Sequence, residues 1–197
     1  TRYPFDGAVV MTVRTAQPVA FPLYLRVPGW CREVGVKIPD AAEHIVDQAG
    51  KLVKINRTWK RGDRVEVNFG MEVKATTWPR TGAITIDRGP LSYSIRIKER
   101  WQVEPGGPEG WPRQSVWPDS SWNYGLVVDP ERPAASIQVE VADSVAAQPW
   151  TEAAAPIVLR VPAKRIPGWK ASIKNTVDAV REGPVRSNRP TELIEMI

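Results

Sequence analysis

The sequence is poor in the residues that build disulfide frameworks, zinc sites and histidine-based catalytic centres. Its 197 residues include one cysteine, Cys31, and one histidine, His44. A single thiol cannot form an internal disulfide, which excludes a small disulfide-stapled fold. One cysteine and one histidine without partners at ligand spacing cannot form a standard zinc site. We therefore predict no catalytic residue, no metal ligand and no cofactor-binding residue in this chain.

Long apolar runs and long helical patterns are also missing. No apolar run approaches the roughly 18 residues that a membrane-spanning helix needs, so no membrane partner is expected. The 19 prolines are spread along the whole chain, and they disfavour long helices because proline fixes φ and lacks a backbone donor. The formal charge of +5 comes without a basic stripe, which argues against nucleic acid as a partner.

The sequence does contain extensive period-two alternation of apolar and polar residues, which is typical of half-buried strands. One predicted strand face collects Val19, Phe21, Leu23, Leu25 and Val27. Residues 52–69 predict a hairpin that turns at KRGD, where Gly62 supplies the flexible position. Farther along, Ile137, Val139 and Val141 are expected to point inward. About ten such short strands with turn signals between them predict an all-β chain with little helix.

A tryptophan- and proline-rich segment, residues 101–122, interrupts the alternation. It holds four of the nine tryptophans and no periodicity, so we predict a long loop, of a kind that tends to be functional or interfacial. The organisation we predict is two consecutive antiparallel β-sandwich domains of jelly-roll or immunoglobulin-like type, residues 1–98 and 99–197. The candidate contact residues are the tryptophans of the loop, Trp101, Trp111, Trp117 and Trp122.

Four stretches of the first half resemble the region downstream of the catalytic domain in glycoside hydrolase family 127, a β-L-arabinofuranosidase-like family once described as a domain of unknown function. They are YPFDGAVVMTV (residues 3–13), FPLYLRVPGWC (21–31), INRTWKRGDRVEVNFGMEV (55–73) and AITIDRGPLSYSI (83–95). Weaker similarity occurs at WNYGLVVD (122–129) and TELIEMI (191–197). Each motif is mostly one strand with its turn, but four in the same order make the resemblance specific.

The resemblance implies a three-part parent protein, in which an α-helical catalytic toroid is followed by two β-sandwich domains. This chain would be the two sandwiches. The parent's acid/base glutamate, nucleophilic cysteine and zinc-ligand cysteines would lie in the helical part, upstream of Thr1, and Cys31 matches none of them. The family pattern continues past Ile197 with one more strand, so the second sandwich is expected to lack its last strand. A strand left unpaired could then pair with another chain.

These observations favour a non-catalytic accessory role, in which the sandwiches brace or dock onto the helical catalytic domain, with a homodimer as a further expected assembly. One alternative is a carbohydrate-binding module that uses the tryptophan-rich loop as a stacking surface for an oligosaccharide. A second alternative is an immunoglobulin-like adhesion module, which the lack of paired cysteines disfavours. Four acidic residues could in principle supply a catalytic carboxylate pair, but we expect each of them at a turn or on the solvent face of a strand: Asp6, Asp63, Glu66 and Asp87.

Overall fold

The computed structural model describes residues 1–42, 44–46, 49–170 and 185–197. Within these ranges, strands dominate, and the one helical element is the short 3₁₀ helix η1, Pro133–Ala135. The structure confirms the predicted all-β class. No helix in the described part of the chain is long and apolar enough to cross a membrane.

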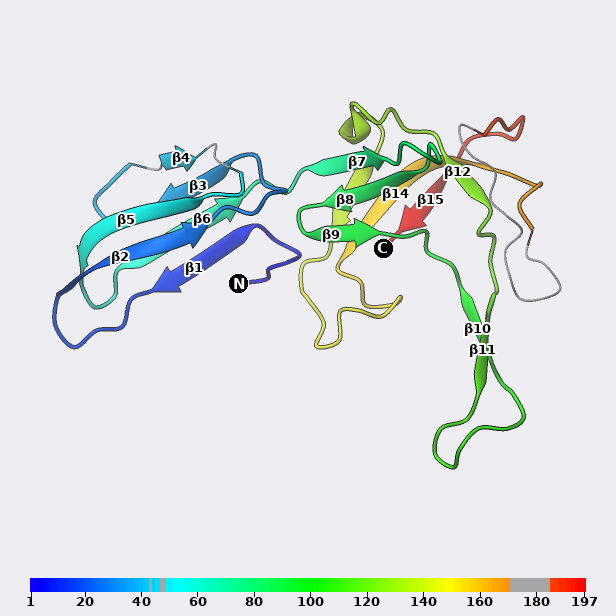
Figure 1. Ribbon diagram of the computed structural model, residues 1–197, viewed down its shortest axis with the longest axis horizontal. Helices are drawn as coiled ribbons and strands as arrows, with labels where there is room; N and C mark the ends of the chain where they lie inside the picture. The colour runs from blue at the N-terminus through cyan, green and yellow to red at the C-terminus, as the bar shows by residue number, and fades with distance from the viewer. Residues whose placement is uncertain (43, 47–48, 171–184) are drawn as a thin grey trace. The chain divides into compact units, whose positions relative to one another are not determined.

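The chain divides into two compact units (Figure 1). Unit 1 comprises Thr1–Lys74 and Asp87–Ser92, and unit 2 comprises Ala75–Ile86 and Tyr93–Ile197. The domain boundary that we placed after residue 98 stays a prediction.

Unit 1 contains two antiparallel sheets. The larger has the strand order β1-β6-β3-β4, with β1 at Ala8–Thr12, β6 at Arg64–Phe69, β3 at Val34–Lys37 and β4 at His44–Val46. The smaller pairs β2, Val19–Arg26, with β5, Leu52–Trp59. Side chains from both sheets and the loops between them form one buried cluster of Val27, Cys31, Val34, Val36, Trp59, Val65 and Val67.

Trp59 is the largest side chain of this core. It is fully buried, its indole Nε1 donates a hydrogen bond of 3.0 Å to the backbone oxygen of Phe21, and the two rings lie 5.9 Å apart. The alternation predicted across residues 19–27 holds in part, because Val27 is buried and Leu23 and Leu25 are half-buried, whereas Val19 and Phe21 are exposed.

The predicted hairpin across residues 52–69 is wrong, because β5 and β6 belong to different sheets. The KRGD turn does form, with Gly62 at φ +90 and the backbone N–H of Lys60 bonded to the Asp63 carboxylate at 2.9 Å. However, the turn is bonded to the end of β1: Val13 donates to the carbonyl of Asp63 and accepts from the N–H of Gly62. These bonds direct the chain into the other sheet, where β6 pairs with β1 and β3.

A second turn, at Arg88-Gly89-Pro90, separates two neighbouring strands of a three-stranded sheet. The sheet has the order β7-β8-β9, with β7 at Val73–Thr77, β8 at Ile84–Arg88 and β9 at Leu91–Tyr93. Gly89 has φ +58, a conformation that other residues resist, and the Arg88 guanidinium donates to the carbonyl of Phe5 at 3.2 Å.

Unit 2 is organised around β14, Ile157–Arg165, which pairs with β12, Tyr124–Leu126, with β13, Gln138–Val141, and with β15, Glu192–Met196. One face of β14 is buried at every second residue, as period-two alternation predicts. The buried apolar residues of these strands and their flanks are Ile137, Ile157, Leu159, Val161, Ala163, Ile166, Ile194 and Met196.

The edges of this sheet differ from expectation. Val139 and Val141 were predicted to point inward but are 38% and 48% exposed, because β13 is an edge strand with β14 on one side. By contrast, β15 is bonded along both edges in the described structure: it pairs with β14, and its other edge bonds to residues 94–96. The expected lack of a last strand stays a prediction.

The predicted loop at residues 101–122 is corrected by the structure, which forms an antiparallel hairpin there. Strand β10, Glu99–Val103, pairs with β11, Gln114–Pro118, and the hairpin extends away from the β12–β15 sheet (Figure 1). The intervening residues include Gly106, Gly107 and Gly110, all at positive φ. The sequence signal was lost because each strand offers only two or three alternating residues before a proline or glycine interrupts it.

Candidate functional site

The β10–β11 hairpin presents an apolar stripe to solvent on one face. In its register, Trp101 lies opposite Val116, and alternation places Val103 on the same face. Trp101 is 60% exposed, and Val103 and Val116 are also exposed. The Trp101 indole N–H donates to the Glu99 carboxylate at 3.0 Å, which fixes the ring on this face. We call the exposed apolar residues Trp101, Val103 and Val116 the hairpin stripe.

The other three candidate tryptophans lie outside the hairpin stripe. Trp117 is opposite Arg100 and therefore on the reverse face of the hairpin, where its Nε1 is buried without a hydrogen-bond partner among the described residues. Trp111 follows the glycine turn and is 79% exposed, whereas Trp122 is half-buried before β12. The four tryptophans thus do not share one face, and their role in binding or docking stays a prediction.

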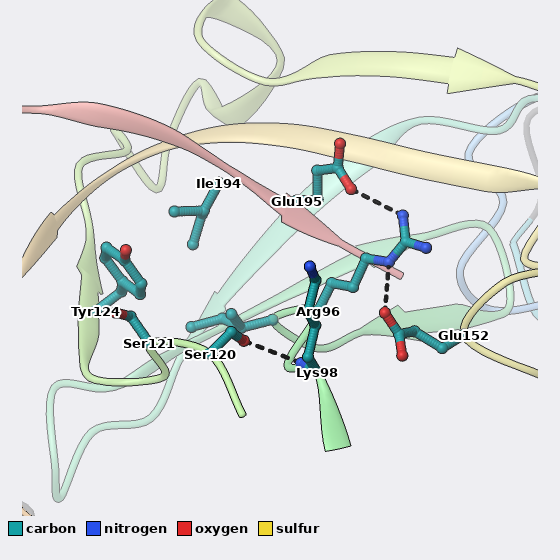
Figure 2. Close-up of a pocket in the computed structure, with 9 residues that line it drawn as sticks. Arg96, Lys98, Ser120, Ser121, Tyr124, Glu152, Ile194 and Glu195 are labelled. Atoms are coloured by element: carbon teal, nitrogen blue, oxygen red, sulfur yellow. Dashed lines mark hydrogen bonds and ion pairs between the residues drawn. The ribbon is translucent and has the colours of Figure 1, made fainter. Parts of the chain in front are cut away.

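A hollow of about 480 Å³ lies elsewhere in unit 2, where four separate segments of the chain meet. Its lining residues come from the segment after β9 (Arg96 and Lys98), from the start of β12 and the residues before it (Ser120, Ser121 and Tyr124), from the loop before β14 (Glu152) and from β15 (Ile194 and Glu195). Figure 2 shows the Lys98 ammonium group directed into the space between these side chains. The backbone N–H of Lys98 donates to the Ser120 hydroxyl at 2.9 Å, which joins two of the segments.

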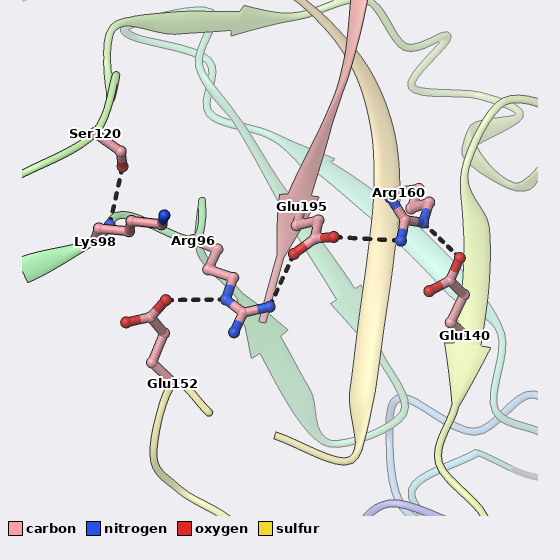
Figure 3. A network of polar contacts seen from close by, with 7 residues as sticks. All are labelled: Arg96, Lys98, Ser120, Glu140, Glu152, Arg160 and Glu195. Carbon is pink, nitrogen blue, oxygen red and sulfur yellow. Dashed lines mark hydrogen bonds and ion pairs between the residues drawn. The ribbon is translucent and has the colours of Figure 1, made fainter. Parts of the chain in front are cut away.

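A chain of ion pairs extends from this hollow across the sheet (Figure 3). The Arg96 guanidinium contacts Glu152 at 3.0 Å and Glu195 at 2.9 Å. Glu195 in turn contacts Arg160 at 3.3 Å, and Arg160 also pairs with Glu140. Because each arginine binds two carboxylates, the network fixes strands β13, β14 and β15, the segment of Arg96 and the loop of Glu152 relative to one another.

The carboxylates also stabilise the charge of both arginines. The hydrogen bond to Glu195, followed by that to Glu152, raises the pKa of Arg96 above its ordinary value. The hydrogen bond to Glu140 raises the pKa of Arg160 in the same way. Arg96 therefore gives the wall of the hollow a charged and oriented guanidinium group, which can help to position a polar ligand.

The described residues do not fit a metal site. No group of three or more histidine, cysteine, aspartate or glutamate side chains lies together in the part of the chain that the structure covers. Cys31 is fully buried in unit 1, where its thiol bonds to the carbonyl of Glu33, and His44 is exposed on β4. The parent zinc that the resemblance implies would have to lie in other residues and stays a prediction.

Sequence reasoning missed the hollow entirely. Arg96, Glu152 and Glu195 are separated by more than forty residues from one another along the chain, and the hydrogen bonds that join them span 56 and 99 residues. Each is an ordinary solvent-face residue of its own segment, so no local pattern singles it out. The pairing of residues 94–96 with β15 brings Arg96 next to Glu195, and the loop before β14 adds Glu152.

Comparison with known proteins gives one family match. The family described as "Beta-L-arabinofuranosidase, GH127 middle domain" matches residues 1–71. A search of the curated proteins found no match. The matched residues lie within unit 1.

Two solved structures are similar over the whole chain. A GH127 β-L-arabinofuranosidase from Geobacillus stearothermophilus T6 is 25% identical, with a TM-score of 0.58, and the match covers 100% of this chain and 26% of that one. A structure described as a glycoside hydrolase is 19% identical, with a TM-score of 0.54, and the match covers 100% of this chain and 28% of that one. At this identity, the likeness supports the fold alone. This chain thus spans about a quarter of the length of either protein. Residues 1–71 are thus similar to the middle domain of glycoside hydrolase family 127, and the whole chain is similar to about a quarter of a GH127 β-L-arabinofuranosidase.

Proposed function

We propose that this chain is the non-catalytic accessory β-sandwich region of a family-127 glycoside hydrolase and that it braces the helical catalytic domain of its parent protein. The observation that carries this proposal is the family match, combined with a structural likeness that covers only 26% of a β-L-arabinofuranosidase. The remaining three quarters of such a protein supply a separate body for the chemistry and a surface onto which the sandwiches can dock.

The hairpin stripe is the surface that we assign to docking. Trp101, Val103 and Val116 expose a continuous apolar face on a two-stranded ribbon, and isolated hairpins of this kind are marginal in water. Large aromatics are enriched at the centres of protein interfaces, where their burial contributes most. Burial of the stripe against the catalytic domain would stabilise both the hairpin and the domain arrangement.

Activity measurements on the chain and on its parent test this function. The purified chain alone should not hydrolyse aryl arabinofuranosides, and turnover that persisted through purification would refute the non-catalytic role. In the parent protein, a Trp101→Ser and Val103→Ser double variant should lower the melting temperature of the catalytic domain. The control is Trp111→Ser, which removes a still more exposed tryptophan outside the stripe. Equal effects of the two variants would contradict docking through the stripe.

A second candidate function is carbohydrate binding by the exposed tryptophans. The observation that favours it is the high exposure of Trp101 and Trp111, since flat apolar rings stack on sugar rings. Tryptophan fluorescence during titration with oligosaccharides separates the two functions. A saturable change that Trp101→Ala or Trp111→Ala abolishes would support binding, whereas an unchanged signal leaves docking as the role of the hairpin.

A further inference from the structure

We infer that the hollow lined by Arg96, Lys98 and Glu152 in unit 2 is a binding site for one unit of an uncharged sugar. This site is separate from the hairpin stripe and does not depend on the accessory role proposed above. Its volume of about 480 Å³ lies within the range of roughly 300–1,000 Å³ that is usual for small-molecule sites.

The charge balance of the hollow selects an uncharged ligand. Two of its lining side chains are basic, Arg96 and Lys98, and two are acidic, Glu152 and Glu195, so the lining has no net charge. A site for an anion would carry excess positive charge, because ion recognition depends on complementary potential. A neutral lining with strong donors and strong acceptors instead suits a molecule that is rich in hydroxyl groups.

The donors and acceptors are arranged for hydroxyls that both donate and accept. Glu152 binds Arg96 through its Oε1 atom, so its second oxygen is outside that ion pair. No described residue lies within ion-pair distance of the Lys98 ammonium group, which points into the hollow (Figure 2). One sugar hydroxyl can accept from Lys98 while a neighbouring hydroxyl donates to Glu152. The Ser120 and Ser121 hydroxyls add further partners at the same wall.

Apolar surface completes the site. Ile95, Ile194 and the ring of Tyr124 also line the hollow, next to the polar groups. A pyranose or furanose ring has both hydroxyl edges and C–H faces, so it matches such a mixed wall better than an acyclic polar molecule does. Because the ion pairs of Arg96 to Glu152 and Glu195 fix this wall, little ordering is needed on binding.

The test is a two-dimensional amide NMR titration of the whole 197-residue chain with the methyl glycosides of galactose, glucose and arabinose. At least one should give saturable shifts at the amides of Lys98, Ser120 and Ser121, with glucuronate and glycerol as charged and acyclic comparisons. Lys98→Met and Glu152→Gln should each weaken binding about tenfold, as expected when a hydrogen bond to a charged group is lost. The matched controls, Lys51→Met and Glu131→Gln, alter exposed residues outside the hollow and should leave the affinity unchanged.

Several outcomes would overturn the inference. Any one of three results would do so. The first is that no neutral glycoside gives saturable shifts, and the second is that the chain prefers glucuronate. The third is that neither single variant, Lys98→Met or Glu152→Gln, weakens binding. Lys98 is in no ion pair of the network, so its variant keeps the fold even if Glu152→Gln disturbs it, and Lys98→Arg should restore part of the affinity. Because binding is measured on the chain alone, failure here leaves bracing of the catalytic domain untouched.

Discussion

Replacement of Gly7 by alanine should destabilise unit 1 strongly, because the fold leaves no room for a side chain at this position. A Cβ atom built on Gly7 would lie 2.1 Å from the carbonyl oxygen of Phe69. Ordinary contact begins at 3.4 Å, so the two backbone segments would have to separate by about 1.3 Å. The obstacle is backbone, which cannot rotate aside as a flexible side chain could.

The expected size of the effect follows from what that separation disrupts. It opens the backbone hydrogen bond of 3.0 Å from Phe69 to Gly7, whose loss costs about 1 kcal/mol. It also displaces Phe69 from the rings of Tyr3 and Trp30, whose centroids lie 6.2 and 5.9 Å away. Overpacking of this kind costs about 1–3 kcal/mol, so the unfolding free energy of unit 1 should fall by about 2–4 kcal/mol.

Amide hydrogen exchange is the appropriate assay because it reports on unit 1 separately from unit 2. Amides of β3 and β6 should lose protection in the Gly7→Ala variant. The control is Gly29→Ala, since a Cβ at Gly29 meets nothing within 4 Å. That substitution should be neutral or stabilising by about 0.4–1 kcal/mol, because alanine restricts the unfolded chain. Equal protection in the two variants would refute the packing argument.

Three further outcomes are expected in unit 1. Trp59→Phe should lower the unfolding free energy by about 1–2 kcal/mol in a urea titration, through the lost indole hydrogen bond and a small cavity, whereas the exposed Trp111 should tolerate the same change. Because Cys31 is fully buried, a thiol reagent should label it only as fast as the unit opens, and rapid labelling of the folded protein would contradict its burial. The hydrogen bond from the Ala8 N–H, and then that from Arg2, lowers the pKa of Asp6 in the folded protein below its ordinary value of 3.8. The ionised Asp6 therefore stabilises the fold fully above pH 3.8, and this contribution is lost as the pH falls through the pKa of the folded state. Asp6→Asn should remove this part of the acid dependence in melting curves, and an unchanged pH profile would show that Asp6 contributes none of it.

Fold class was accessible from the sequence because the burial of one strand face is a local property. Alternation along residues 157–163 becomes the buried face of β14, and the positive φ of Gly62 and Gly89 follows from turn chemistry within a few residues. The resemblance to family 127 was accessible for a related reason: YPFDGAVVMTV and the motifs that follow it combine a strand with its own turn.

Strand partners were not accessible in the same way. The KRGD turn joins two extended strands whether they pair with each other or enter different sheets, and the bonds between Val13 and residues 62–63 decide the matter. Similarly, the β10–β11 hairpin depends on backbone pairing of two short segments that each lack a convincing pattern.

The sequence by itself determined that this chain is all-β, that it lacks an internal disulfide, and that it resembles the sandwich region of family-127 proteins. Only the tertiary structure decided which strands share a sheet, which tryptophans reach solvent, and that Arg96, Lys98, Glu152 and Glu195 line one hollow. The physical reason is the range of the interactions. Alternation and turns act over a few residues, whereas the ion pairs of Arg96 join positions that are 56 and 99 residues apart.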